Sequence, residues 1–223
     1  MRLEKDSLGE LEVPDEAYYG IQTVRTSNNY KVSNHTYNEY PEVIAAVAEI
    51  KKACAITNAQ IGALNEEKAR AICKACDEVI SGKFLGHFPV NVWRSQGTGV
   101  NMNVNEVLAN RANEILTGKV SYEAIHPNTH VNMCQSSNDV FPTAEAIVIF
   151  RLIEPVLKAA KEIESTLLIK AQEFKEVVRL GRTGLQDAVP MTWGQVFAGW
   201  LRSVSRVRKE LENIRPIFQF GVM

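Results

Sequence analysis

Three segments of the sequence are rich in glycine and in residues with hydroxyl or carboxamide side chains. Hydroxyl and carboxamide groups hydrogen-bond readily to a carboxylate. The three segments are SQGTGVNMNVNEV (95–107), HPNTHVNMCQSSNDVFPT (126–143) and GRTGLQDAVPMTWGQ (181–195). Each lies next to an expected helix, and the free backbone N–H groups and positive dipole end of a helix start also attract anions. The same residue types are the usual capping and turn residues, so helix caps and an anion-binding site are both open interpretations.

The second of these segments contains four small polar side chains in a row, Ser136, Ser137, Asn138 and Asp139. They stand between a cysteine and a Phe-Pro step, after which an apolar helical pattern starts. Such a run either caps the following helix or holds a ligand at its N-terminus. No Gly-rich phosphate loop, dinucleotide-binding fingerprint or serine-hydrolase elbow occurs in the sequence.

The histidines and cysteines do not indicate a metal centre. His126 and His130 have i, i+4 spacing, but Pro127 between them argues against a regular helix and so against a metal-binding pair. Cys73 and Cys76 form a C-x-x-C motif in EEKARAICKACDEVI, where both fall on the apolar face of an expected helix. No second motif completes a tetrahedral zinc site. We therefore interpret the two cysteines as part of a helical core and expect no bound metal.

The composition is that of an ordinary globular protein. The 223 residues include 25 basic and 26 acidic side chains, a formal net charge of -1, and the two signs are mixed along the chain. A basic surface for nucleic acid or anionic lipid is therefore not expected. The N-terminal residues contain no signal-peptide core, and no apolar run approaches the roughly 18 residues of a membrane span. These features predict a cytoplasmic protein with a small neutral or anionic ligand and no nucleic-acid or membrane partner.

Apolar residues recur at helical spacing over most of the chain, whereas strand signals are nearly absent. The first 40 residues lack this periodicity and predict an irregular extended arm. The expected helices cover 41–62, 66–81, 103–117, a long segment from Ile149 with apolar residues as far as Phe174, and 193–214. We therefore predict an all-α fold, with a mostly helical N-terminal domain in 1–139 followed by the first long helices of a central helical bundle in 140–223.

The long helix expected from Ile149 repeats its apolar residues at the a and d positions of a heptad, which is typical of helices that pack lengthwise. Two such helices cannot close a bundle alone. Their apolar faces either pack against residues 1–135 in one compact domain, or belong to a larger bundle completed by other copies or by further sequence. The second interpretation predicts a homo-oligomer.

Four segments spread over nearly the whole chain resemble the fumarase/aspartase superfamily, and specifically its branch of class II fumarases and aspartate ammonia-lyases. They are VPDEAYYGIQTVR, FPVNVWRSQGTGVNMNVNEVLANRA, HPNTHVNMCQSSNDVFPTA and GRTGLQDAVPMTWGQ. Within the branch, DEAYYG, HVNMCQS and DAVPMT are more similar to aspartases. Fumarases tend to carry Leu-Trp-Gly at the first of these places and DATPLT at the last.

The resemblance implies reversible anti β-elimination of ammonia from L-aspartate to give fumarate, with no organic cofactor. A base would remove the proton next to the β-carboxylate, whose oxygens then carry the charge of an enediolate that hydrogen-bond donors stabilise. By analogy with the family, Thr98, Ser136 and Ser137 would donate to this carboxylate. Asn138 would meet the amino group, and Thr183 would meet the other carboxylate.

Arg25, in TVRTSNN, resembles an arginine that supports substrate binding in aspartases. The sequence departs from the family at Gly184, where relatives carry His, or Gln in some aspartases. Glycine has no side chain to meet the leaving group, which counts against a fumarase. The family's GSSxMPxKxNP loop, which supplies the serine base and a carboxylate-binding lysine, does not occur in the chain, so we identify no catalytic residue.

These features leave three hypotheses. The resemblance favours an aspartase-like lyase that acts on the small dicarboxylates L-aspartate and fumarate. We expect this chain to be the N-terminal portion of the family fold and the complete fold to be a homotetramer. The alternatives are a relative of class II fumarate hydratase, and a non-catalytic helical fragment that binds dicarboxylates through the retained donors.

Overall fold

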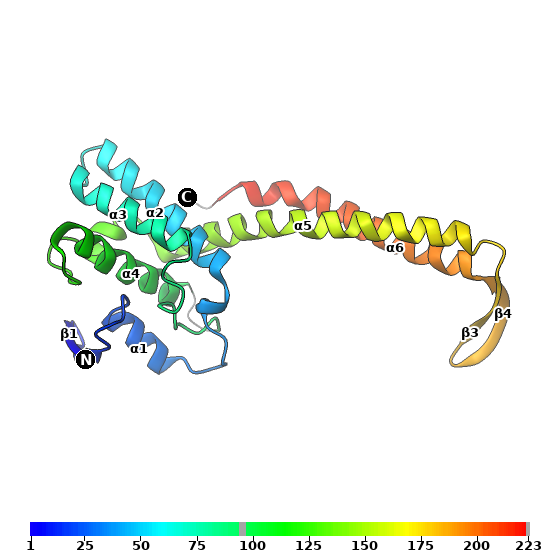
Figure 1. Cartoon of the computed structure of the whole chain (residues 1–223), viewed down its shortest axis with the longest axis horizontal. Coiled ribbons are helices and arrows are strands. Elements are labelled where there is room, and N and C mark those ends of the chain that lie inside the picture. The colour runs from blue at the N-terminus through cyan, green and yellow to red at the C-terminus, as the bar shows by residue number, and fades with distance from the viewer. Residues whose placement is uncertain (94–96, 222–223) are drawn as a thin grey trace. The chain divides into compact units, whose positions relative to one another are not determined.

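The computed structural model describes residues 1–93 and 97–221 of the chain (Figure 1). These residues divide into two compact units, a first unit of Met1–Val148 together with Gly221 and a second unit of Ile149–Phe220. Helix α5 runs through both the unit division and the domain boundary that the sequence predicts after residue 139. That domain boundary therefore stays a prediction.

The fold is dominated by α-helices, which confirms the predicted all-α class. Three of the expected helices are found within two residues of their predicted bounds, one begins five residues earlier than expected, and the heptad pattern from Ile149 lies in a longer helix that begins at Ser137. The helices are α1 Ile21–Asn29, α2 Pro41–Gln60, α3 Glu66–Ile80, α4 Thr98–Thr117, α5 Ser137–Glu173 and α6 Trp193–Ile214, joined by the short helical turns η1 Tyr37–Glu39, η2 Pro127–Val131 and η3 Arg215–Gln219.

Local sequence signals explain where several helices begin and end. Pro41 occupies the first turn of α2, where its missing N–H costs nothing. The Asn65 side chain caps α3, and Thr192 and Gln195 form a reciprocal capping box at the start of α6. Helix α4 ends at Gly118, whose φ of 76° is the left-handed conformation that glycine adopts without strain.

The prediction that the first 40 residues form an irregular arm was wrong in part. They contain the antiparallel hairpin of β1 (Arg2–Asp6) and β2 (Gly9–Val13), followed by α1. The segment 181–195, predicted as a short link, lies mostly in a second antiparallel hairpin, formed by β3 (Val178–Thr183) and β4 (Gln186–Thr192). Strands of five to seven residues in isolated pairs carry too short an alternation to stand out from loop sequence.

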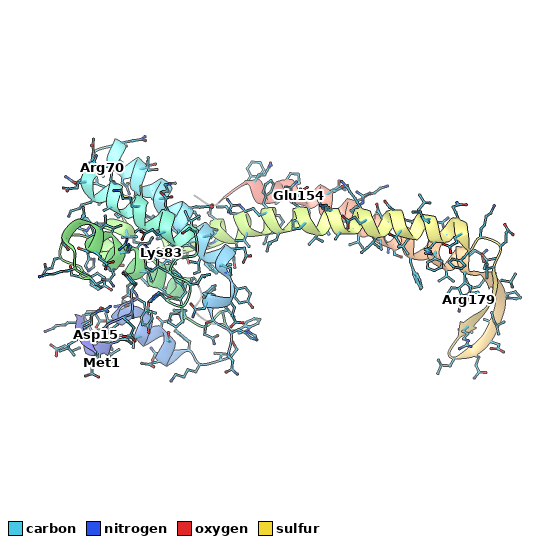
Figure 2. The ribbon with its side chains drawn as sticks, in the orientation of Figure 1. Met1, Asp15, Arg70, Lys83, Glu154 and Arg179 are labelled. Atoms are coloured by element: carbon cyan, nitrogen blue, oxygen red, sulfur yellow. The ribbon has the colours of Figure 1, made fainter. Side chains whose placement is uncertain are left out.

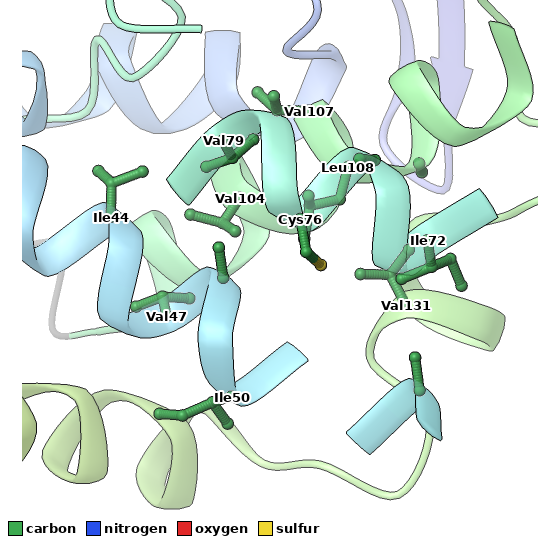
Figure 3. Packing of buried hydrophobic residues seen from close by; sticks show 14 of the residues in the cluster. Ile44, Val47, Ile50, Ile72, Cys76, Val79, Val104, Val107, Leu108 and Val131 are labelled. Atoms are coloured by element: carbon green, nitrogen blue, oxygen red, sulfur yellow. The ribbon is translucent and has the colours of Figure 1, made fainter. Parts of the chain in front are cut away.

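The core of the first unit lies between α2, α3 and α4 (Figure 3). Ile44 and Val47 of α2 pack with Ile72 of α3 and Leu108 of α4, all at most 1% exposed. Cys76 is fully buried in the same cluster, and none of the four cysteines forms a disulfide. The C-x-x-C motif therefore lies on a core helix, as the periodicity predicted.

The second unit contains the remainder of α5, the β3–β4 hairpin and α6. The rings of Phe174 and Phe197 stack with centroids 5.7 Å apart, and Arg208 of α6 donates to Glu164 of α5 at 2.9 Å. Many apolar side chains of this unit remain exposed. They include Leu152, Val156, Ile163, Ile169, Trp200, Val207 and Ile214.

Charged side chains of both signs are spread over both units, with Arg70 and Lys83 on the first and Glu154 and Arg179 on the second (Figure 2). Several form exposed ion pairs, such as Arg70 with Glu66. Within residues 1–93 and 97–221, no helix combines the length and the hydrophobicity that crossing a membrane requires.

Candidate carboxylate-binding site

The N-termini of α4 and α5 meet at two predicted site residues. Thr98 is the first residue of α4 and Ser137 the first of α5, and their hydroxyl oxygens are 3.2 Å apart. A helix start presents unpaired backbone N–H groups and the positive end of the helix dipole. Two helix starts that converge on a pair of hydroxyl groups form an environment that favours an anion.

Gly97 makes this convergence possible. It precedes α4 with a φ of 75°, which is strained for other residue types. A Cβ atom at Gly97 would lie 2.9 Å from the Cβ atom of Phe141 in α5, closer than such atoms approach in proteins. Glycine is therefore required by both the backbone conformation and the packing of α5 against the start of α4.

The polar run of residues 136–139, at the start of α5, both caps this helix and exposes hydrogen-bond donors. The Ser136 hydroxyl oxygen accepts from the Asn138 N–H at 3.2 Å, and the Ser136 carbonyl accepts from the N–H of Asp139 at 3.1 Å. The bond from the Asn138 N–H uses a lone pair of the Ser136 hydroxyl oxygen and leaves the Ser136 O–H free to rotate toward a ligand. Ser136 and Asn138 are exposed and Ser137 is half-buried, so all three can be reached from solvent.

Arg25 does not join this group. Its guanidinium donates to both carboxylate oxygens of Asp6, at 2.8 and 2.9 Å, and to the Gly9 carbonyl at 3.1 Å. The hydrogen bond with Asp6 raises the pKa of Arg25 and lowers that of Asp6. Within the described residues, Arg25 therefore fastens α1 to the β1–β2 hairpin, and its predicted support of substrate binding stays a prediction.

Thr183 lies in the second unit, at the turn of the β3–β4 hairpin, where its side chain is exposed. Thr183 pairs with Gln186 across a two-residue turn of Gly184 and Leu185, whose φ angles are 52° and 64°. Two positive φ angles define the type of turn that suits a tight hairpin. The turn conformation therefore explains why glycine occurs at position 184, since a Cβ atom there would meet nothing within 4 Å.

A largely buried polar cluster surrounds Asn132, four residues before Ser136, and was not predicted from the sequence. The Asn132 Oδ1 atom accepts from Lys51 Nζ at 2.8 Å and from the side-chain amides of Asn101 and Asn105, each at 3.1 Å. The Asn132 amide in turn donates to the Gln135 carbonyl at 2.9 Å. A signal was present, because asparagines spaced i, i+4 in NMNVN share one helix face with apolar neighbours.

Lys51 is fully buried, and no carboxylate pairs with it among the described residues. Burial lowers its pKa to about 7, because a charged amine is poorly solvated in the core. The thiols of Cys54 and Cys76 act electrostatically on Lys51, but burial raises their own pKa values, so they remain uncharged near neutral pH.

His126 and His130 bind backbone donors instead of facing a common ligand. The His130 Nδ1 atom accepts from the His126 N–H at 2.9 Å, and the His126 Nδ1 atom accepts from the Asn128 N–H at 3.2 Å. The segment between them forms η2, which begins at Pro127. In the described parts of the chain, no three His, Cys, Asp or Glu side chains cluster closely enough to hold a metal ion.

The N-terminus of α1 already has an anion of its own. The buried Glu106 carboxylate accepts from the N–H groups of Gly20, Gln22 and Thr23 at 2.9 to 3.0 Å and from the Thr23 hydroxyl at 2.7 Å. Burial raises the pKa of Glu106, and these four hydrogen bonds oppose that shift. The start of α4, in contrast, has no side-chain cap hydrogen bond within the described residues.

Comparison with known proteins identifies the family. The sequence model of a family described as lyase matches residues 9–222, nearly the whole chain. The chain belongs to the lyase family. Among the curated relatives of this lyase chain, an aspartate ammonia-lyase from a Bacillus species is 43% identical over 217 residues, covering 96% of this chain and 46% of the relative. A class II fumarate hydratase from Neisseria meningitidis is 49% identical over 206 residues, covering 90% of this chain and 44% of the relative.

Solved structures give the same result. A fumarate lyase:delta crystallin from Brucella melitensis has a TM-score of 0.91 and 41% identity, over 99% of the lyase chain and 50% of the solved chain. A class II fumarase from Schistosoma mansoni has a TM-score of 0.87 and 38% identity, over 99% and 47%. These relatives confirm the resemblance to the fumarase/aspartase superfamily. The lyase chain spans about half the length of the curated relatives it matches.

Proposed function

We propose that this chain supplies the carboxylate-binding part of a lyase site that acts on a small dicarboxylate. The observation that carries the proposal is the meeting of the α4 and α5 N-termini, with the Thr98 and Ser137 hydroxyl oxygens 3.2 Å apart. A dianion needs several donors on each carboxylate, and hydroxyl groups at two helix starts supply them without a fixed cation.

The proposed chemistry is an elimination across the Cα–Cβ bond. A base removes a proton from the carbon next to one carboxylate, the electron pair moves onto that carboxylate as an enediolate, and the leaving group then departs from the neighbouring carbon to give fumarate. Thr98, Ser136 and Ser137 donate to the oxygens that gain charge, where preorganised donors have their largest effect on rate. No residue of this chain is proposed as the base.

The remaining predicted residues would complete the contacts to the substrate. Asn138, exposed beside Ser137, would hydrogen-bond to the amino group of aspartate. Thr183 would bind the second carboxylate, and Arg25 would support binding. The family resemblance also leads us to propose a homotetramer in the cytoplasm.

L-aspartate is the first candidate substrate. The motifs DEAYYG, HVNMCQS and DAVPMT favour an ammonia-lyase, and Gly184 offers no side chain to a leaving hydroxyl group. The second candidate is hydration of fumarate to malate. It is favoured by the 49% identity to a class II fumarate hydratase, against 43% to the aspartate ammonia-lyase.

Proton NMR of the chain with fumarate, in the presence and absence of ammonia, tests these candidates. Aspartate formed only with ammonia would identify an ammonia-lyase, and malate formed in both samples would identify a hydratase. Fumarate that binds but does not react would support the carboxylate-binding part of the proposal and assign turnover to residues outside this chain. Fumarate that neither binds nor reacts would refute the proposal.

A matched pair of serine variants tests the site. Ser137→Ala removes a hydroxyl group from the meeting point and should weaken dicarboxylate binding about tenfold, the effect of one lost hydrogen bond to a charged group. Ser165→Ala serves as the control, because Ser165 lies on the same helix and its exposed hydroxyl donates only to the Lys161 carbonyl. Equal affinities of the two variants for fumarate would contradict the assignment of Ser137.

A further inference from the structure

Asn132 connects the loop before α5 to the two helices beneath it. Its Oδ1 atom is the common acceptor for Lys51 of α2 and for Asn101 and Asn105 of α4, while its amide group holds the Gln135 carbonyl. One side chain therefore fixes the backbone immediately before Ser136 relative to the helical core.

The orientation of the Asn132 amide is determined by its surroundings. Three donors surround Oδ1, and one carbonyl faces Nδ2. If the amide were reversed, its oxygen would face the oxygen of the Gln135 carbonyl, and this contact would become repulsive. Asn132 therefore acts as a directional link that only a group with an acceptor and a donor side can replace.

The link reaches the part of α4 that carries the predicted ligand Thr98. Thr98, Asn101 and Asn105 have i, i+3, i+7 spacing, so they lie on one face of α4. Asn132 thus holds the start of α5 against the same face that presents the Thr98 hydroxyl. The 3.2 Å approach of Thr98 and Ser137 lies next to this anchored segment.

The loop also adopts a conformation that needs support. Cys134, between Asn132 and Ser136, has a φ of 59°, which is unfavourable for a residue with a side chain. Other bonds also hold this segment, among them those from the Asn58 amide to the Met133 carbonyl at 3.2 Å, from the Gln135 N–H to the Asn132 carbonyl at 3.1 Å and from the Gln135 side-chain amide to the Val131 carbonyl at 2.9 Å. An unsupported loop would relax Cys134 to a negative φ and move the residues that follow it.

We propose that Asn132 is a positioning residue of the lyase site, which sets the placement of Ser136, Ser137 and Asn138 without touching the substrate. This proposal rests on the proposed dicarboxylate site for its function. Its structural part, that Asn132 anchors the loop before α5, rests only on the hydrogen bonds of Asn132. The two parts can therefore be tested separately.

The test variant is Asn132→Asp. The aspartate keeps an acceptor for Lys51, Asn101 and Asn105, and it gives the buried amine a counterion, so the core of the first unit should remain folded. Its second oxygen, however, faces the Gln135 carbonyl, where the amide of Asn132 donates at 2.9 Å. The matched control is Asn128→Asp, the same change at an exposed position four residues earlier.

Hydrogen exchange without ligand tests the structural part. The hydrogen-bonded amides of Gln135, Asn138, Asp139 and Val140 should exchange about tenfold faster in N132D than in the wild type, the effect of one lost hydrogen bond. The buried amides of 104–109 in α4 should exchange unchanged, and N128D should match the wild type in both segments. Equal exchange of these four amides in N132D and the wild type would overturn the proposal, and so would faster exchange spread evenly over α4 and the loop.

Fumarate binding tests the functional part. We expect N132D to bind fumarate about tenfold more weakly and N128D to bind it normally. Weak binding together with a loosened loop supports positioning, whereas a loosened loop with unchanged binding overturns it. If the wild type itself binds no fumarate, the proposed function fails while the exchange result still decides the structural part. Should N132D not fold, Asn132→Ser offers a neutral side chain too short to reach all four partners, with the same expected outcomes.

Discussion

Replacing the buried Lys51 by methionine should stabilise the first unit at neutral pH. The pKa of Lys51 is lowered from 10.5 to about 7 by burial, so at pH 7 folding removes about half of the proton that this side chain binds in the unfolded chain. A difference of about 3.5 pKa units corresponds to about 5 kcal/mol at low pH and to about 4 kcal/mol at pH 7. Methionine has a similar length and no charge to desolvate.

The lost hydrogen bond to Asn132 offsets part of this gain. A neutral amine contributes about 1 kcal/mol through such a bond, and Asn132 keeps its bonds from Asn101 and Asn105. The net expectation for Lys51→Met at pH 7 is therefore a stabilisation of about 3 kcal/mol. The free-energy penalty of Lys51 is complete below its folded pKa and vanishes above the unfolded value. The advantage of the variant should thus fall as pH rises from about 7 and disappear near pH 10.

The free energy of opening can be measured from the slowest-exchanging amides of α4, because α4 lies in the core of the first unit. Lys52→Met is the matched control. Lys52 is half-buried, and its ion pair with Asp77 at 2.6 Å should contribute no more than about 1 kcal/mol. A K51M variant that is less stable than the wild type at pH 7, or whose advantage is the same at pH 7 and pH 10, would refute the reasoning.

Two further predictions concern glycine and left-handed positions. Gly97→Ala should destabilise the first unit by about 2 to 4 kcal/mol, because it combines a positive φ with a 2.9 Å clash against Phe141. Urea unfolding measures this loss, and a value below about 1 kcal/mol would contradict the close contact between Gly97 and Phe141. Leu185→Gly should stabilise the β3–β4 hairpin by about 1 kcal/mol, because Leu185 is 93% exposed with a φ of 64° and so loses strain without losing packing. Slower hydrogen exchange of the β3 and β4 amides would report the gain, and faster exchange would argue against it.

Helical periodicity predicted α2, α3 and α6 well because their apolar positions and their start and stop signals agree. The start of α4 was predicted too late, at about 103, because its first turn is polar, and for the same reason the heptad pattern of α5 is evident only from Ile149. Thr98 and Ser137 follow glycine and serine residues that are typical of loops, and Pro142 in the second turn of α5 also obscured the helix. The polar first turns of these two helices are the same residues that form the candidate site.

The composition of the site could be predicted from the sequence, but its assembly could not. Thr98 and Ser137 are 39 residues apart, and nothing in their local sequence indicates that their hydroxyl groups meet. The resemblance to a known family brought them together before the structure did. Lys51 was not predicted at all, because a lysine within a helical pattern is normally exposed, and the acceptor that it reaches when buried, Asn132 Oδ1, lies 81 residues further along the chain.

The buried asparagines of α4 suggest why a helix at the centre of a core is so polar. Asn103 donates to the His87 carbonyl at 2.9 Å, and Asn110 donates to the Tyr18 carbonyl at 2.8 Å. Asn105 contributes to the cluster described above in the same way. Leucine at positions 103 and 110 would bury more apolar surface, but it would leave the His87 and Tyr18 carbonyls without these donors, at about 1 to 3 kcal/mol for each group. Helix α4 therefore determines the paths of the connecting segments around it, including the one that carries the candidate carboxylate ligands.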